Sequence, residues 1–435
     1  MQFKIHRGTK EIGGSCIEVW TDKTRIVLDF GMPLVFPDNP AYDLQKLYDY
    51  SIDQLIGFGL LPEIQGLYLS KERPVNGLFI SHAHMDHYGL IDFIRPDLEV
   101  FLGAPTHELI KITSLFSGKT RDLKRCNYFK SAEPLSIGDI IVTPYLMDHS
   151  AFDAYAFLIE SEGKSIFYSG DFRKHGRKPN AFYWFTHNCL KNVDFLLLEG
   201  TSIGRSEKVS LSEPEIESIF SREFSKHKFT MVYSSGQNID RLVSIYKACK
   251  NAGRIFAIDF YTANVLLSLS KYASLPFPSP NFPEIRVFFP WGLSKKMSDL
   301  GHKQLLYNFT DFKISKEQIN GDPGKIVMFV RPTMKVDINR LFCLSGGTFI
   351  YSLWSGYLKD KRTNDFVSYL QSKGMEFMAI HTSGHADIPT LREMISALNP
   401  SVIIPVHTFE SNRYQEVFPD RNIRIVNDKD VIDVV

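Results

Sequence analysis

The stretch SHAHMDHYG, residues 81–89, holds three of the 13 histidines in this 435-residue chain. His82, His84 and His87 follow one another closely, and Asp86 precedes the last of them. Such a cluster is either a polar surface loop or part of a metal site, because imidazole and carboxylate groups are common metal ligands. A metal site needs further ligands, so residues elsewhere in the chain decide between the two interpretations.

Apolar runs of strand length recur along the chain, and several of them end directly at an ionisable residue. Examples are GLFISHAHMDH, IIVTPYLMDHS, KSIFYSGDF, VDFLLLEGT, MEFMAIHTSGH and PSVIIPVHT, which lead to His82, His149, Asp171, Glu199, His385 and His407. In layered α/β proteins, ligands bind in the crevice beyond the strand ends. We therefore expect these side chains to share one site.

The ligand types favour a dinuclear centre. His82 and His84 can bind one ion together with His149, and Asp86 and His87 can bind a second ion together with His407. Asp171 is suited to bridge the two. Imidazole and carboxylate without thiolate favour Zn²⁺ first and Mn²⁺ next. Two such ions, roughly 3.5–4 Å apart, can share a hydroxide and stabilise the attacking and leaving oxygens of a phosphoryl displacement.

The order of these residues predicts an interrupted domain. Ionisable strand ends occur between residues 29 and 199, are then missing for a long stretch, and return at 385 and 407. We expect a first domain over residues 1–205, an inserted domain over 206–375 and a return segment over 376–435. Helices are predicted at LSEPEIESIFSREFSKHK, which opens with Ser212 and Glu215 in capping-box spacing, and from Asp387 onward.

The composition is that of a globular protein, with 44% hydrophobic residues. Lys and Arg total 50 against 49 for Asp and Glu, so any polyanion must be held by a local patch rather than by net charge. The five cysteines are scattered and form no CxxC pair, which favours a reducing compartment. No signal peptide or membrane span is recognisable, so we expect a cytoplasmic protein without membrane contact.

These motifs carry a family resemblance. SHAHMDH, DHS around His149 and SGD around Asp171 resemble successive motifs of the metallo-β-lactamase fold. Glu199 in LLLEGT, His385 in HTSGHAD and His407 in IPVHT resemble the later motifs of the β-CASP nucleases. The chain as a whole is similar to RNase J-type enzymes. The resemblance implies an α/β protein with a metallo-β-lactamase αββα sandwich and an inserted β-CASP α/β domain.

The resemblance also implies residue roles. The metal ligands would be His82, His84, Asp86, His87, His149, Asp171 and His407, holding two Zn²⁺, with Mn²⁺ as the alternative. Asp86, Glu199 and His385 would be catalytic: His385 would contact the scissile phosphate or protonate the leaving oxygen, and Glu199 would orient it. Asp29 would steady the histidine loop. A histidine at position 407 resembles the RNA-cleaving rather than the DNA-repair branch of the family.

Substrate contacts are predicted at Ser383 and Gly384, which precede a helix N-terminus where a phosphate can bind, and at Arg173 beside Asp171. In the inserted segment, YSSGQNIDR resembles the family's backbone-binding stretch and nominates Ser235 and Arg241. The alternative for this stretch is a strand-to-helix turn whose polar side chains cap the helix.

The sequence thus predicts a metal-dependent ribonuclease that hydrolyses phosphodiester bonds of single-stranded RNA through a metal-activated water and leaves 5′-phosphate products, in RNA processing or decay. A DNA nuclease of the same fold is one alternative. A small-molecule metallo-hydrolase is another, although it has no need of the insertion or of Glu199 and His385. A non-catalytic RNA-binding subunit is a third, but such proteins usually lack metal ligands. Exonuclease or endonuclease action, and monomer or homodimer, are left open.

Overall fold

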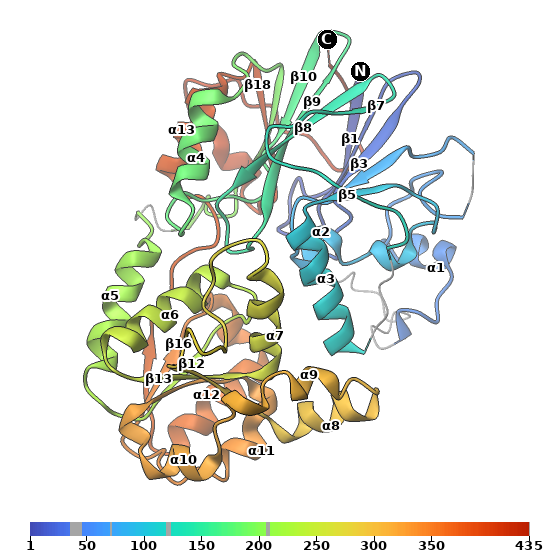
Figure 1. Ribbon diagram of the computed structural model, residues 1–435. Helices are drawn as coiled ribbons and strands as arrows, with labels where there is room; N and C mark the ends of the chain where they lie inside the picture. The colour runs from blue at the N-terminus through green and yellow to red at the C-terminus, as the bar shows by residue number, and fades with distance from the viewer. Residues whose placement is uncertain (35–45, 70–71, 119–122, 206–208, 435) are drawn as a thin grey trace.

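The computed structural model describes residues 1–34, 46–69, 72–118, 123–205 and 209–434. In these ranges the chain forms three β-sheets with helices packed around them (Figure 1). The first sheet has the order β19-β1-β2-β3-β4-β5-β6, with β1 (Gln2–Arg7), β2 (Cys16–Trp20), β3 (Arg25–Leu28), β4 (Gly77–Phe79), β5 (Val100–Leu102), β6 (Cys126–Tyr128) and β19 (Val431–Asp433). The second has the order β18-β11-β10-β9-β8-β7, with β7 (Leu135–Ile137), β8 (Ile140–Met147), β9 (Ala154–Ser161), β10 (Lys164–Tyr168), β11 (Phe195–Glu199) and β18 (Val402–Val406).

These two sheets pack face to face through one buried apolar layer. Phe3, Val19 and Phe79 of the first sheet share this layer with Phe157 and Leu197 of the second. The rings of Phe79 and Phe157 meet edge to face with centroids 5.8 Å apart, a favourable geometry for two aromatic rings. The apolar residues of the inner faces thereby set the spacing and alignment of the two sheets.

Helices cover the outer faces of this sandwich. The helix α3 (Ala104–Ser117) packs beside the first sheet, and α4 (Pro179–Asn188) and α13 (Ile388–Leu398) pack on the second (Figure 1). Asp387 caps α13 by accepting a hydrogen bond from the Thr390 amide, as its position in the sequence predicts. The predicted αββα sandwich is confirmed.

The third sheet lies apart from the sandwich and has the order β14-β13-β15-β12-β16-β17. Its strands are β12 (Thr230–Tyr233), β13 (Ile255–Asp259), β14 (Ile285–Phe288), β15 (Ile326–Phe329), β16 (Thr348–Tyr351) and β17 (Glu376–Ala379). All of its strand pairs are parallel. Most of its strands are almost continuously apolar because helices bury both faces, as parallel sheets require. This is the inserted α/β domain that the sequence predicts.

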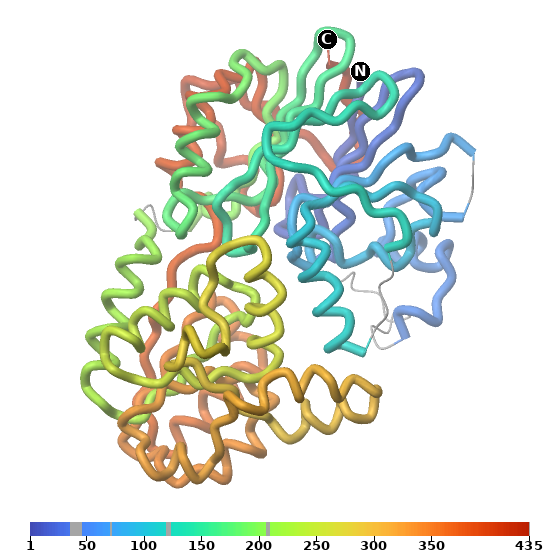
Figure 2. Tube along the Cα trace, viewed as in Figure 1, coloured from blue at the N-terminus to red at the C-terminus, as the bar shows by residue number. Residues whose placement is uncertain are grey.

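The chain path explains the interruption. After β11 the chain enters the third sheet, and it later returns to lay β18 parallel to β11 (Figure 2). Strand β17 pairs with β16, although the sequence places the end of the insertion at residue 375. We therefore propose that the inserted domain extends through Ala379. The start proposed at residue 206 lies outside the described residues.

The remaining helices complete both parts. They are α1 (Ile52–Gly57), α2 (Met85–Tyr88), α5 (Glu213–Phe224), α6 (Ile239–Asn251), α7 (Phe260–Leu269), α8 (Trp291–Asp299), α9 (Gln304–Tyr307), α10 (Lys316–Gly321), α11 (Lys335–Ile338), α12 (Lys361–Ser372) and α14 (Tyr414–Val417). A 3₁₀ turn, η6 (Ser355–Lys359), follows β16. Helix α5 opens with the predicted capping box of Ser212 and Glu215. Among the described helices, none combines the length and hydrophobicity needed to cross a lipid bilayer.

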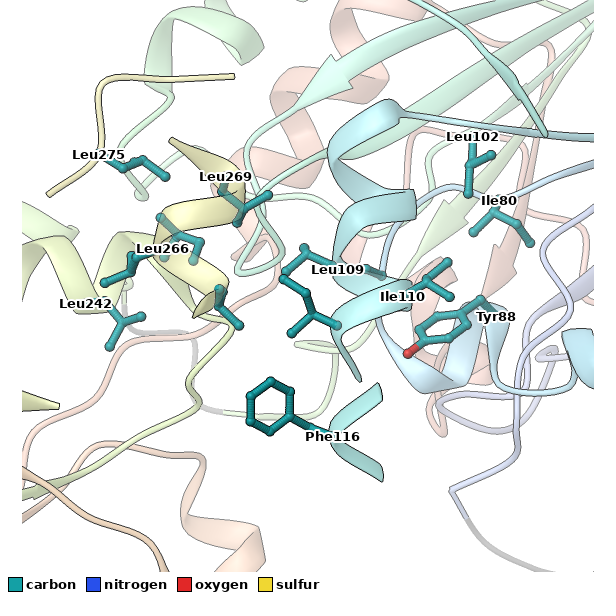
Figure 3. Packing of buried hydrophobic residues seen from close by; sticks show 14 of the residues in the cluster. Ile80, Tyr88, Leu102, Leu109, Ile110, Phe116, Leu242, Leu266, Leu269 and Leu275 are labelled. Carbon is teal, nitrogen blue, oxygen red and sulfur yellow. The ribbon is translucent and has the colours of Figure 1, made fainter. Parts of the chain in front are cut away.

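The sandwich and the inserted domain also touch through α3 and α7. Phe116 on α3 lies against Phe260 and Tyr261, with ring centroids 5.6 Å and 4.9 Å apart. Figure 3 shows Phe116 and Leu109 of α3 beside the leucines of α7. Lys296 of α8 donates to the Phe116 and Ser117 carbonyls, both at 2.9 Å, and so binds the C-terminal end of α3. The metal centre described next lies at the strand ends of the sandwich.

Candidate metal centre

The loop after β4 carries the histidine cluster, and one buried aspartate holds it. Asp29 accepts hydrogen bonds from the Ser81 amide at 2.7 Å and from the Ser81 hydroxyl at 2.8 Å. The Tyr168 hydroxyl donates to the same carboxylate at 2.8 Å. His87 Nδ1 also lies 2.8 Å from Asp29. This matches the steadying role that the family resemblance implies for Asp29.

Partners on Nδ1 direct Nε2 of four histidines toward a common point. His87 is oriented by Asp29 as described, and His82 Nδ1 lies 3.0 Å from the Ser81 hydroxyl. His149 Nδ1 donates to the Gly384 carbonyl at 2.5 Å. His407 Nδ1 lies 2.9 Å from the Thr201 hydroxyl. These Nδ1 contacts leave Nε2 of each ring as the nitrogen that would bind a cation.

His84 presents its other nitrogen. Its Nδ1 lies 3.1 Å from Nε2 of His82 and also 3.1 Å from Nε2 of His149. Three imidazole nitrogens from two different loops thus converge, which is the geometry of three ligands on one side of a metal ion. A second group, Asp86 with His87 and His407, is equally compact.

Asp171 lies between the two groups. Its Oδ2 is 3.2 Å from His87 Nε2 and 3.9 Å from His82 Nε2, and its Oδ1 is 3.6 Å from His407 Nδ1. The carboxylate also approaches His149 Nε2, at 4.0 Å. A carboxylate in this position can bind two ions at once, as the sequence predicts for Asp171.

Unpartnered buried atoms support the fit of a metal. Within the described part of the chain, both oxygens of Asp171, Nε2 of His87 and Nδ1 of His385 are buried and have no hydrogen-bond partner. Leaving a buried carboxylate without partners costs several kcal/mol, so such groups are paired or bind metal. The donor set of imidazoles and carboxylates fits two divalent cations.

The protonation states also suit metal binding, since a histidine binds a metal only in its neutral form. Burial lowers the pKa of His82 and His149 well below the ordinary value, and burial lowers the pKa of His84 to about 4. These three imidazoles are therefore neutral at pH 7.

The second group differs in charge. Burial alone would raise the pKa of Asp86 and of Asp171, but the neighbouring His407 and His87 outweigh it and hold both pKa values low. Burial would lower the pKa of His87, but the Asp171 and Asp29 carboxylates raise it well above the ordinary value. A metal ion would displace the extra proton of His87, because ligand binding requires its lone pair.

Glu199 and His385 form a pair at the edge of the centre. His385 Nδ1 lies 3.3 Å from Glu199 Oε2 and 3.7 Å from Asp171 Oδ2. The Glu199 carboxylate is itself fixed by the Thr201 amide at 3.1 Å and by the Ala386 amide at 3.3 Å. The His385 side chain is 20% exposed, whereas the side chains of His82 and His407 are only 0% and 2% exposed. His385 can therefore reach a substrate.

Two predicted substrate contacts are contradicted by burial. Arg173 and Arg241 are fully buried. Arg173 donates to Asp240 at 2.7 Å and to the Ser383 carbonyl at 2.9 Å, and Arg241 donates to Glu213 at 3.0 Å. Their charges are satisfied inside the protein, so neither guanidinium is exposed for the predicted contact with a polymer.

The other predicted contacts remain near open space. Ser235 is exposed and lines a cavity of about 490 Å³ at the ends of the parallel strands of the third sheet. Ser383 lies close to the centre, but its hydroxyl accepts a hydrogen bond from the His385 amide at 3.0 Å. Gly384 contributes its carbonyl to His149. Asn238 caps α6, so the capping alternative holds for part of the YSSGQNIDR stretch.

Sequence reasoning missed three residues that support the centre. Asp148, Thr201 and Tyr168 are buried and bind Arg173, His407 and Asp29, respectively. Asp148 directly precedes His149 in the string MDHS, and Thr201 closely follows Glu199 in the string EGT. That proximity is the only sequence signal for them, since their partners lie far away along the chain.

Comparisons with known proteins agree with the fold and the centre. The model of the β-lactamase superfamily domain matches residues 51–233, and that of the Zn-dependent metallo-hydrolase RNA specificity domain matches residues 375–414. Ribonuclease J of Helicobacter pylori (strain ATCC 700392 / 26695) is 25% identical over 98% of this chain and 60% of its own length. Ribonuclease J of Sinorhizobium meliloti is 20% identical over 88% of this chain and 63% of its own length.

A solved structure shows the same fold. The crystal structure of a protein of unknown function from Enterococcus faecalis V583 superposes with a TM-score of 0.80, at 22% identity and over 99% of both chains. Some curated relatives match nearly the whole of this chain but are longer than it. The chain spans about three fifths of their length, and 60% of the length of the Helicobacter pylori protein.

The sandwich, with its histidine and aspartate cluster and its match to the β-lactamase superfamily domain over residues 51–233, has the metallo-β-lactamase fold. With the third sheet inserted between β11 and β18, and with its similarity to ribonuclease J over 98% of this chain and 60% of that protein, the chain resembles RNase J with its β-CASP domain.

Proposed function

We propose that this chain is a metal-dependent ribonuclease that hydrolyses phosphodiester bonds of single-stranded RNA and leaves 5′-phosphate products, in RNA processing or decay. The single observation that carries the proposal is the pair of Glu199 and His385 beside the dinuclear cluster, with His385 partly exposed. The names of the curated relatives and of the matched RNA specificity domain support RNA as the substrate.

His82, His84 and His149 would hold one Zn²⁺, Asp86, His87 and His407 the other, and Asp171 both. Two such ions, when bound, lower the pKa of a water and neutralise the charge that develops on the phosphate. Mn²⁺ accepts the same ligands and is the alternative metal.

His385 supplies the proton that the leaving oxygen needs. Burial alone would lower the pKa of His385, but the Glu199 and Asp171 carboxylates outweigh it and raise the pKa. The imidazole therefore stays protonated closer to neutral pH, as a general acid requires. Glu199 acts as the positioning residue, because its carboxylate faces Nδ1 of His385 and leaves Nε2 toward the substrate.

We also propose a cytoplasmic location. The five cysteines are free, and burial raises the pKa of the Cys16 and Cys249 thiols, so they are kept as inert thiols in a reducing environment.

The test uses zinc-loaded protein and one single-stranded RNA labelled at either end, with a DNA of the same sequence beside it. We expect cleavage of RNA, no cleavage of DNA, and a loss of kcat of about 10²–10⁴-fold in His385→Ala. His187→Ala, an exposed histidine on α4, is the matched control and should retain full activity. Mononucleotide products indicate exonuclease action, internal fragments indicate endonuclease action, and light scattering separates monomer from homodimer.

Cleavage of neither polymer by protein that holds both metals would overturn the proposal in favour of a small-molecule metallo-hydrolase. Equal cleavage of DNA would indicate a nuclease without RNA specificity, whereas binding of RNA without cleavage would indicate a non-catalytic RNA-binding subunit.

A further inference from the structure

Three side chains from two distant segments form a cluster beside the metal centre. The Arg205 guanidinium lies over the Trp354 ring, with its Cζ 4.7 Å from the ring centroid. Tyr357, on η6, meets the same indole edge to face, with ring centroids 5.4 Å apart. We call Arg205, Trp354 and Tyr357 the aromatic platform. It joins the end of the first part of the sandwich to the third sheet.

The platform is exposed although it is composed largely of aromatic surface. Trp354 is 43% exposed, Tyr357 is 49% exposed, and Arg205 is exposed as well. The indole packs closely over Gly356, since a Cβ added there would lie only 2.3 Å from its ring atoms. The chain thus holds two aromatic rings in a fixed arrangement at the surface. Packing in the protein core does not explain their position, because both rings are exposed.

The charge of the platform is not neutralised locally. Within the described ranges of the chain, no carboxylate lies within ion-pair distance of Arg205, unlike Arg173 and Arg241. A guanidinium that lies over an aromatic ring keeps the N–H groups at its own edge available for an oxyanion. Phosphate is the anion that such a group recognises.

The platform borders the metal centre. Arg205 ends a turn that is tied to the centre, because its amide donates to the Ser202 carbonyl at 3.1 Å and the Ser202 hydroxyl donates to the Ala386 carbonyl, next to His385, at 2.5 Å. Burial lowers the pKa of Arg205, and the Glu199 carboxylate opposes this shift in part. On its other side, Tyr357 lines the cavity of about 490 Å³ that Ser235, Gln237 and Arg331 also line. An RNA strand that ran from this cavity to the metal centre would pass the platform.

We propose that the aromatic platform binds a single-stranded RNA next to the scissile bond, with an unpaired base stacked on its rings and the adjoining phosphate bound by Arg205. This inference deepens the proposed ribonuclease function and rests on it. An RNA fits better than a protein partner, because stacked rings beside an uncompensated cation match the alternating bases and phosphates of a nucleic acid. Stacking is tolerant of sequence, so the platform supplies affinity and register rather than base specificity.

The experiment measures the Kd of a labelled, cleavage-resistant single-stranded RNA on zinc-loaded full-length protein by fluorescence anisotropy. Loss of one stacked base weakens binding by roughly 5- to 100-fold, so Trp354→Ala should raise Kd by about tenfold or more. Trp354→Phe, which keeps a stacking ring, should stay within about threefold of the wild type.

Two further variants serve as controls. Trp291→Ala removes another exposed tryptophan that has a lysine above its ring, Lys295 at 5.6 Å, on α8. It should leave Kd unchanged. Gly356→Ala keeps all platform side chains but displaces the indole, and it should weaken binding like Trp354→Ala. This variant tests the geometry independently of any effect of deleting the tryptophan on folding.

Replacing one base at a time by an abasic residue locates the stacked nucleotide. The proposal expects one position at which base loss weakens binding to the wild type but has no effect on Trp354→Ala. If Trp354→Ala and Gly356→Ala bind RNA like the wild type while the wild type cleaves RNA, the proposal that the platform binds RNA is wrong and the proposed ribonuclease function stands. If the wild type neither binds nor cleaves RNA, the ribonuclease function and the platform both fall.

Discussion

Arg173 donates a hydrogen bond of 2.7 Å to Asp240, and this bond connects the catalytic sandwich to the inserted domain. Arg173 lies two residues after Asp171, and Asp240 lies in the first turn of α6. The same guanidinium also binds Asp148, next to His149, and the Ser383 carbonyl, next to Gly384. One buried cation therefore ties the inserted domain to the loops that carry metal ligands and His385.

This hydrogen-bond network predicts that replacing one carboxylate by an amide has a large effect on the free energy of unfolding. Asp240→Asn should lower the free energy of unfolding by about 3–5 kcal/mol, because it leaves the buried Arg173 charge without one of its carboxylates. Urea denaturation at pH 7 measures the loss. Glu393→Gln, which removes an exposed ion pair with Lys174, is the control and should cost less than about 1 kcal/mol. Equal effects of the two variants would show that the buried network does not stabilise the domain contact.

The metal content should follow the two ligand groups. We expect about two zinc ions per chain in the wild type and about one in His149→Ala, because His149 belongs to one group only. Asp171→Asn should weaken both sites, since this carboxylate approaches both groups. Elemental analysis and native mass spectrometry measure the content, and Glu133→Gln, at an exposed carboxylate, is the control. Two tightly held ions in His149→Ala would contradict this ligand assignment.

Acid stability should depend on a carboxylate far from the metal. Burial alone would raise the pKa of Glu18, but hydrogen bonds from His6 and Arg25 outweigh it and lower the pKa from 4.5 to about 2. Because the folded value is depressed, this stabilisation is fully present above about pH 4.5 and is lost as the pH falls through about 2.

The contribution is at most about 3 kcal/mol at neutral pH. Glu18→Gln should therefore be less stable than the wild type at pH 7, and the difference should shrink steadily between pH 5 and pH 2 in urea titrations. A difference that does not change with pH would mean that the loss comes from packing rather than from the charge of Glu18.

The aromatic contact between the domains gives a further prediction. Phe116→Ala should lower the free energy of unfolding by about 3–4 kcal/mol, because it removes a buried ring that packs on Phe260 and Tyr261. Phe342→Ala removes a ring that is 87% exposed and should change stability by less than about 0.5 kcal/mol. Hydrogen exchange should show faster exchange in α3 and α7 of the first variant only. Protection of these helices equal to the wild type would contradict the proposed contribution of the ring.

The architecture and the convergence of the centre were predictable because the strand pattern is local. When an apolar run ends at His149, Asp171 or Glu199, the side chain lies at the end of a strand, and this placement follows from the local sequence. Sheet alternation and the order of the motifs then determine which residues can meet. The structure brings the seven predicted metal ligands together with Glu199 and His385, while the roles of these residues remain predictions.

The structural role of the buried arginine side chains was not predictable in the same way. Arg173 stands in a basic run that reads as a phosphate-binding surface, but its partners, Asp148, Glu213 and Asp240, lie on other elements. A sequence shows that a charge exists and not whether a distant carboxylate neutralises it. The proposed extension of the insertion through β17 was not predictable for a related reason, since the pairing of β17 with β16 is a long-range contact.

The position of His385 in the chain has a mechanical consequence. This residue lies on the short connection from β17, the edge strand of the third sheet, to α13 of the sandwich. The side chains proposed to bind metal, by contrast, lie on strand ends and loops of the sandwich itself. A molecule that wedged the two domains apart would therefore pull away both the proposed proton donor and the Gly384 carbonyl that orients His149, which defines a route to inhibitors that need no metal-chelating group.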